Sequence, residues 1–93
     1  MTFLDKMRSR LPIGAEIDLS TYLYDGTYSQ PETFEVIEVN CSQGDEDRMV
    51  VVAYRRIGAK GSLNVMVFTP GSMDHSKNDH QQRINRVRPK EFS

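Results

Sequence analysis

Five short runs of strand-forming residues, separated by segments rich in glycine, proline and polar residues, constrain the fold of this chain most strongly. The first run, Ala15–Tyr24, alternates between apolar and polar residues, and this period of two is typical of a half-buried strand. The Asp25-Gly26 pair directly after it predicts a turn. The beginning of the chain therefore already favours a β-rich fold.

Four further runs have strand character. In residues 33–41 the alternation fails near Val36-Ile37, as expected for a β-bulge. The third run, Met49–Ile57, is apolar on both faces, which predicts a central strand. Leu63–Thr69 and Ile84–Arg88 complete the set.

Three polar segments connect these runs. Ser42–Asp47 is predicted to be an acidic loop, and Gly58–Ser62, which contains two glycines, a hairpin loop. Pro70–Gln82 is the longest loop, and we expect at most one helical turn in it, around Asp74–Asn78.

Thr2–Leu11 predicts a short helix before the sheet. Thr2 is a favourable N-cap, and Asp5 follows three residues later, close to the capping-box spacing. The apolar residues share one face at helical spacing: Phe3, Leu4, Met7 and Leu11. A helix of this length is marginal by itself, so we expect it to pack over one end of the sheet.

Together these elements predict a mostly β protein: a small five-stranded barrel with a short N-terminal helix, in one domain spanning residues 1–93 (helix 2–11, barrel 13–89). The number and lengths of the strands and the Gly14-Ala15-Glu16-Ile17 entry resemble the SH3-like barrels, including those of the KOW and Tudor type. An OB-like barrel is the alternative. That fold usually has longer strands and a helix between the third and fourth, where this chain has the glycine hairpin.

Charge is divided into blocks along the chain. Residues 1–10 carry a formal charge of +2, residues 11–47 carry −9 with no Lys or Arg, and residues 48–93 carry +6, which gives a net charge of −1. Two arrangements agree with this division. Acidic and basic strands could neutralise each other side by side, or the two signs could occupy separate faces suited to different partners.

Three groups of side chains are therefore candidate contacts. The acidic group is Glu16, Asp18, Glu35, Glu38, Asp45, Glu46 and Asp47. The basic group is Arg55, Arg56, Lys60, Arg83, Arg86, Arg88 and Lys90. The aromatic group is Tyr22, Tyr24, Tyr28 and Tyr54, which could stack on bases or receive a peptide.

Catalytic and metal chemistry have little support in the sequence. Cys41 is the one cysteine, which excludes an internal disulfide and thiolate-rich zinc sites, and we expect it to be a small buried apolar residue. His75 and His80 each follow an aspartate in the long polar loop, and a solvated loop is the interpretation we prefer to a metal site. We expect no enzyme activity, no cofactor and no metal.

Location and partners follow from the same features. The longest unbroken apolar stretch, Met49–Tyr54, is far shorter than a membrane span, and the first residues do not look like a signal peptide, so we expect a cytoplasmic protein without membrane contact. The favoured function is a binding module that acts as a regulator or inhibitor on a larger protein or nucleoprotein complex. Direct DNA or RNA binding through the basic C-terminal half is the alternative. We expect a monomer or an edge-paired homodimer.

Overall fold

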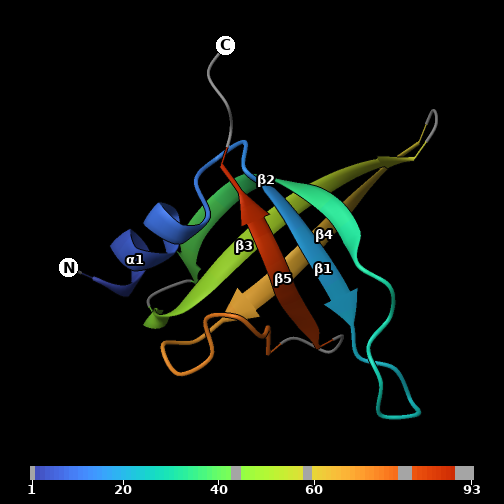
Figure 1. Ribbon diagram of the computed structural model, residues 1–93. Coiled ribbons are helices and arrows are strands. Elements are labelled where there is room, and N and C mark those ends of the chain that lie inside the picture. The colour runs from blue at the N-terminus through green and yellow to red at the C-terminus, as the bar shows by residue number, and fades with distance from the viewer. Residues whose placement is uncertain (1, 43–44, 58–59, 78–80, 90–93) are drawn as a thin grey trace.

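One helix and one antiparallel sheet make up the computed structural model, which describes residues 2–42, 45–57, 60–77 and 81–89. The elements in chain order are α1 (Phe3–Arg10), β1 (Glu16–Thr21), β2 (Glu32–Ser42), β3 (Asp45–Ile57), β4 (Lys60–Phe68) and β5 (Gln82–Arg88). The strand order across the sheet is β4-β3-β2-β1-β5 (Figure 1). The mostly β fold and its five strands are as predicted.

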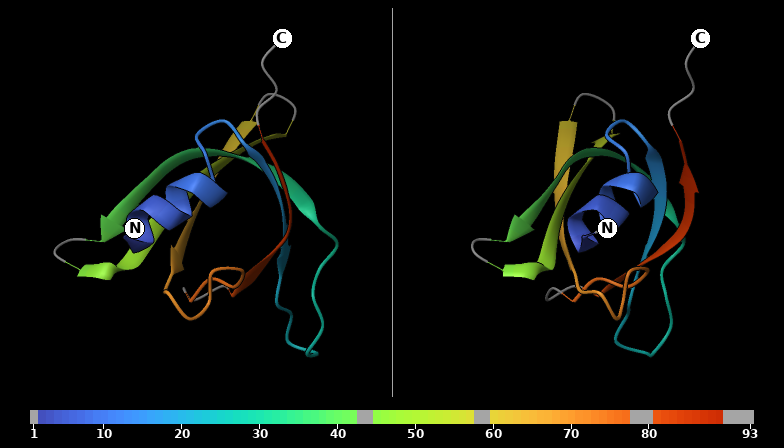
Figure 2. Two further views of the ribbon diagram at one scale, coloured as in Figure 1. Left: turned by 60° about the vertical axis from the view of Figure 1, so that its left-hand side comes forward. Right: turned by 90° about the vertical axis from the view of Figure 1, so that its left-hand side faces the viewer.

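Helix α1 forms where the sequence predicts it. The Asp5 amide donates to Thr2 Oγ1 at 3.1 Å and the Thr2 amide donates to Asp5 Oδ2 at 3.3 Å, so the capping box is complete. Met7 and Leu11 are fully buried against the sheet, while Phe3 and Leu4 pack at the edge of the core. Figure 2 shows the sheet bent around this core with α1 on its concave side.

A β-bulge in β2 decides which residues of this strand enter the core. The pairing between β2 and β3 shifts between Val36 and Glu38, as the broken alternation predicts. Because of the extra residue, Phe34, Val36 and Val39 are buried although their spacing is not strictly two. Their partners on the concave face include Met49 and Val51 of β3, which are fully buried.

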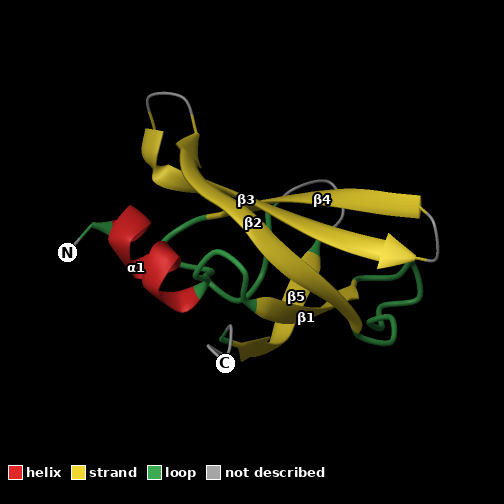
Figure 3. Cartoon of the chain, turned by 90° about the horizontal axis from the view of Figure 1, so that it is seen from above, coloured by secondary structure: helices red, strands yellow, loops and turns green. Residues whose placement is uncertain are grey.

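The sheet is open within the described residues, since β4 and β5 are its two edges and do not pair with each other. Residues 69–77 lie across the opening. The Lys77 amide donates to the Val67 carbonyl at 2.7 Å, and the Ile84 amide donates to the Asp74 carbonyl at 2.8 Å. The side chain of Gln82 accepts from Asn64 Nδ2 at 2.8 Å, which connects the two edges directly. Figure 3 shows the separation of the edges from above.

Several predicted boundaries were wrong. β1 ends at Thr21 rather than Tyr24, because Tyr22 forms only an isolated bridge to Tyr28 before the turn. The acidic segment 42–47 is not a loop throughout, since Ser42 pairs with Asp45 and extends both strands. Residues 60–62 belong to β4 rather than to the hairpin loop.

The long loop also differs from the prediction. His75 bridges Arg83 as an extended residue, and Ser76 is fully buried with its Oγ accepting from the Gln82 amide at 2.9 Å. The single helical turn that the sequence allowed here is absent over residues 74–77, because this backbone pairs with β5 instead; residue 78 lies outside the described residues.

The prediction of a buried Cys41 was wrong as well. Cys41 is opposite the buried Met49 on the concave side, but β2 continues past the core, and the thiol is exposed beside Phe3 and Leu4.

Candidate binding groove

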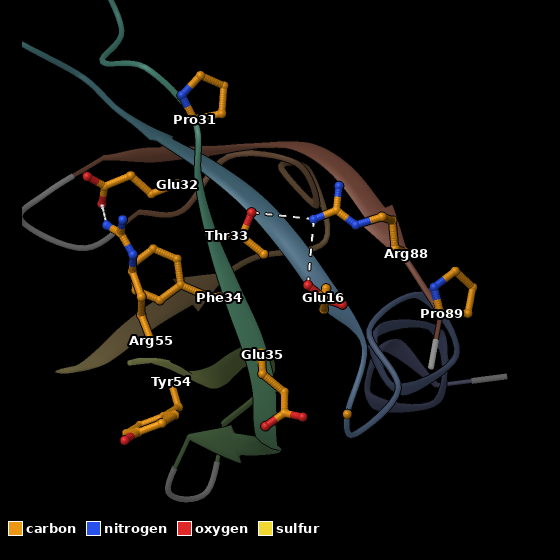
Figure 4. Close-up of a pocket in the computed structure, with 11 residues that line it drawn as sticks. Glu16, Pro31, Glu32, Thr33, Phe34, Glu35, Tyr54, Arg55, Arg88 and Pro89 are labelled. Atoms are coloured by element: carbon orange, nitrogen blue, oxygen red, sulfur yellow. Dashed lines mark hydrogen bonds and ion pairs between the residues drawn. The ribbon is translucent and has the colours of Figure 1, made fainter. Parts of the chain in front are cut away.

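An open groove of about 1030 Å³ lies where β1, β2, β3 and β5 come together (Figure 4). Its apolar walls come from Pro31, Phe34, Tyr54 and Pro89. Its charged side chains are Glu16, Glu32, Glu35, Arg55 and Arg88, three carboxylates against two guanidinium groups. We call this site the acidic groove.

Arg88 holds one end of the acidic groove in place. Its guanidinium donates to both oxygens of Asp18, at 2.9 and 2.8 Å, and its Nη2 lies 3.8 Å from Glu16 Oε2. Thr33 Oγ1 donates to Asp18 Oδ1 at 2.8 Å. Burial alone would raise the pKa of Asp18, but the hydrogen bonds from Arg88 and Thr33, with the positive charges of Arg88 and Arg86, outweigh it and lower this pKa.

Arg55 holds the other end. Its Nη1 lies 2.6 Å from Glu32 Oε2, and its guanidinium carbon lies 5.9 Å from the centre of the Phe34 ring. These contacts place Arg55 over the rim of the core, so its charge is compensated by a neighbouring strand.

Glu35 is the exception among the charged residues of the acidic groove. It is exposed, and in the described part of the chain nothing donates a hydrogen bond to it or pairs with it. Its strand neighbours in register are Glu16 of β1 and Tyr54 of β3. Two carboxylates therefore lie opposite each other at the border between β1 and β2. Among the described contacts, Arg88 forms an ion pair with Glu16 but not with Glu35.

Tyr54 owes its position to a glycine. A Cβ built on Gly61 would lie 2.6 Å from Tyr54 Cε2 and 2.8 Å from Cζ, so the Tyr54 ring occupies the space next to the Gly61 backbone. Gly61 thus leaves room for Tyr54 to line the acidic groove.

The other basic candidates do not join this site. Arg83 stacks on Tyr28, with 4.2 Å from its guanidinium carbon to the ring centre, and donates to Asn85. Arg86 is exposed opposite Asp18, and Lys60 is exposed at the start of β4. The side chain of Arg56 and the whole of Lys90 lie outside the described residues.

The remaining acidic candidates are dispersed. Glu38 accepts from Asn40 and lies outside the acidic groove, and Asp47 lines a separate small hollow next to α1. The side chains of Asp45 and Glu46 lie outside the described residues.

The aromatic candidates divide into two places. Tyr54 belongs to the acidic groove, whereas Tyr22, Tyr24 and Tyr28 lie in the loop between β1 and β2. Sequence reasoning did not select Pro31, Glu32, Phe34 or Pro89. Glu32 carried a signal, because it belongs to the acidic block, but only the strand register brings it to Arg55.

Other kinds of site have little support in the described residues. Among the described side chains, no group of three or more His, Cys, Asp or Glu is placed to hold a metal ion, and His80 lies outside them. No helix in the described ranges has the length and apolar character needed to cross a membrane. Comparison with family models, with curated proteins and with solved structures finds no match for this chain.

Proposed function

We propose that this chain is a non-enzymatic protein-binding module, a regulator or inhibitor that docks on a larger protein or nucleoprotein complex through the acidic groove. The observation that carries the proposal is Glu35, an exposed carboxylate with no partner among the described side chains, in a groove whose two arginines are both paired. A charge that the described side chains leave uncompensated beside apolar walls is suited to a partner that supplies the opposite charge.

The occupant proposed is an extended segment of a partner protein that contains Lys or Arg next to apolar residues. Its cation would form a charge-assisted hydrogen bond with Glu35. Its apolar side chains would pack on Tyr54 and the two prolines that line the acidic groove. A volume of about 1030 Å³ is at the upper end of what ligand sites enclose, which leaves room for several residues of such a segment.

We also propose that the sheet is that of an SH3-like barrel. The support is the order of the strands, in which β5 returns to pair with β1 after a meander of β1 to β4. Residues 69–77 and the Asn64–Gln82 hydrogen bond lie where the two edges would meet. This arrangement agrees less with an OB-like barrel, because β3 and β4 follow each other directly as a hairpin, with Ile57 opposite Lys60.

Direct binding of DNA or RNA is the second candidate. Exposed Arg86 and Lys60 support it, but Arg55, Arg83 and Arg88 each contact an acidic or aromatic side chain of the same chain. Releasing them for phosphate would break those contacts, so protein binding is the better-supported function.

A selection from a random-peptide display library on the immobilised full chain tests the proposal. Selected peptides should contain Lys or Arg beside apolar residues. In fluorescence anisotropy with a selected peptide, Glu35→Lys should weaken binding by about tenfold or more, because it places like charges together.

Glu38→Lys is the matched control, since it makes the same charge change on the same strand outside the acidic groove, and it should leave the Kd within about twofold. The proposal fails if no peptide is enriched or if the two variants weaken binding equally. Titration of single- and double-stranded DNA and RNA oligonucleotides at low salt tests the second candidate, which requires affinity that falls with salt and with Arg86→Glu.

A further inference from the structure

The loop between β1 and β2 presents three consecutive large side chains to solvent. Tyr22 and Leu23 are 48% and 41% exposed, and Tyr24 is fully exposed. Single exposed apolar residues are ordinary, but a run of three is disfavoured unless it is used, because it gains nothing from burial in the folded chain. In Figures 1 and 2 this loop extends away from the body of the molecule.

Several contacts nevertheless fasten the base of this loop. Tyr22 and Tyr28 form a bridge across its base, with their rings edge to face at 5.5 Å between centres. The guanidinium carbon of Arg83 in β5 lies 4.2 Å from the centre of the Tyr28 ring. The base is fastened further, because the Thr21 amide donates to Ser29 Oγ at 2.9 Å.

The tip has its own hydrogen bonds. The Leu23 amide donates to the Thr27 carbonyl at 2.7 Å, and Asp25 Oδ1 accepts from the amide and the hydroxyl of Thr27 at 3.0 and 2.6 Å. Gly26 completes the turn with φ +86°, a conformation that favours glycine. Asp25 and Thr27 thus bond to each other within the turn, while Leu23 and Tyr24 remain exposed to solvent.

We propose that the loop at residues 22–30 is a preformed anchor, and that Tyr24 and Leu23 insert into a concave apolar pocket on a protein partner. An aromatic side chain on a rigid loop binds without a large ordering cost, which is how a few residues dominate many interfaces. This surface is separate from the acidic groove and does not depend on the function proposed for it.

The negative charge at the tip of the loop favours a protein partner over a ligand that carries phosphate groups. The hydrogen bond from the Thr27 side chain, and to a smaller extent that from the Thr27 amide, lower the pKa of Asp25. The tip of the loop therefore carries a negative charge at neutral pH. No Lys or Arg occurs between residues 11 and 47. Phosphate groups of nucleic acids or of anionic lipids would be repelled there, whereas an apolar pocket with a polar rim would not.

The first part of the test is photo-crosslinking of the full chain to its partner in cells of the organism that produces it. The full chain carries p-benzoylphenylalanine in place of Tyr24 or, as a control, of Ile13, which is also exposed but lies elsewhere. One adduct of defined mass should form from position 24 and not from position 13. Absence of such an adduct overturns the proposal.

The second part uses the identified protein, purified, in a binding titration. Tyr24→Ala should weaken the Kd by about 30-fold or more, Tyr24→Phe by less than about fivefold, and Ile13→Ala should have no effect. A far-UV circular dichroism spectrum that matches that of the wild type shows that each variant is folded. An unchanged Kd for Tyr24→Ala, or Tyr24-dependent binding to phosphatidylserine vesicles or to DNA or RNA oligonucleotides, overturns the proposal.

Discussion

The ion pair between Arg88 and Asp18 should connect β1 to β5 energetically as well as geometrically. Its two hydrogen bonds are bidentate, and the Asp18 side chain is 18% exposed and that of Arg88 35%. Fully exposed pairs contribute 0.2–1 kcal/mol, and bidentate geometry with partial burial moves a pair toward the top of that range. We therefore expect a coupling free energy of about 1 kcal/mol.

A double-mutant cycle measures this coupling. Asp18→Asn removes the charge but keeps an oxygen that can accept from Thr33, and Arg88→Met keeps much of the apolar stem. Urea unfolding followed by far-UV circular dichroism is the assay, since the chain has no tryptophan. With a slope near ~1.5 kcal/mol per molar urea, 1 kcal/mol corresponds to a midpoint shift of about 0.7 M.

The pair between Arg10 and Asp74 is the control, because both side chains are more exposed, at 37% and 57%. Its coupling should stay below about 0.5 kcal/mol. If the Arg88–Asp18 coupling is no larger than that of the control, the argument from geometry and burial is wrong.

The same pair predicts a pH dependence. Because the folded pKa of Asp18 lies below its ordinary value of 3.8, its contribution is present above that pH and is lost as the pH falls through the folded pKa. The stability difference between wild type and Asp18→Asn should thus be constant near neutrality and decrease below about pH 4. A difference that grows on acidification would contradict this reasoning.

Three further predictions concern packing and exposure. Met7→Ala should destabilise the chain by about 2–4 kcal/mol, since Met7 is fully buried between α1 and the sheet; a change under 1 kcal/mol in urea unfolding would contradict it. Gly61→Ala should lower stability by about 1 kcal/mol in wild type but not beside Tyr54→Ala, because the new methyl group meets the Tyr54 ring. Cys41 should react with Ellman's reagent in the native state at nearly the rate of the unfolded chain, and reaction only after unfolding would disprove its exposure.

Local signals in the sequence predicted the local features well. Thr2 and Asp5 form the expected capping box, since such a contact spans only three residues. The broken alternation at Val36-Ile37 located the bulge. Because side chains alternate between the two faces of a strand, an extra residue interrupts the alternation of apolar and polar residues.

Features that depend on distant partners could not be predicted in this way. Cys41 follows an apolar run, yet its burial depends on where the core ends, which the sequence does not mark. Ser42 and Asp45 read as loop residues by composition, but they pair because the hairpin of β2 and β3 extends beyond the core. Phe34 has the pattern of a core residue, and the sequence alone does not show that it also lines the acidic groove next to Arg55.

The division of charge along the chain acquires a specific meaning from the order of the strands. Acidic β1 and β2 are neighbours in the middle of the sheet, and basic residues of β5 and β3 flank them on either side. Opposite charges therefore meet at the two outer borders, as Arg88–Asp18 and Arg55–Glu32 show. At the inner border like charges meet, and this leaves Glu35 opposite Glu16.

Glu35 should consequently be unfavourable for folding and favourable for binding. Like charges directly opposite on two strands destabilise a sheet, so Glu35→Gln should raise the free energy of unfolding by about 0.3–0.5 kcal/mol at low salt, and less at high salt. The same variant should weaken binding of a selected cationic peptide, since the charge-assisted hydrogen bond is lost. Urea unfolding at two salt concentrations and peptide titration measure the two effects. If Glu35→Gln instead lowers the free energy of unfolding and leaves the peptide affinity unchanged, Glu35 supports the fold and does not belong to a binding site.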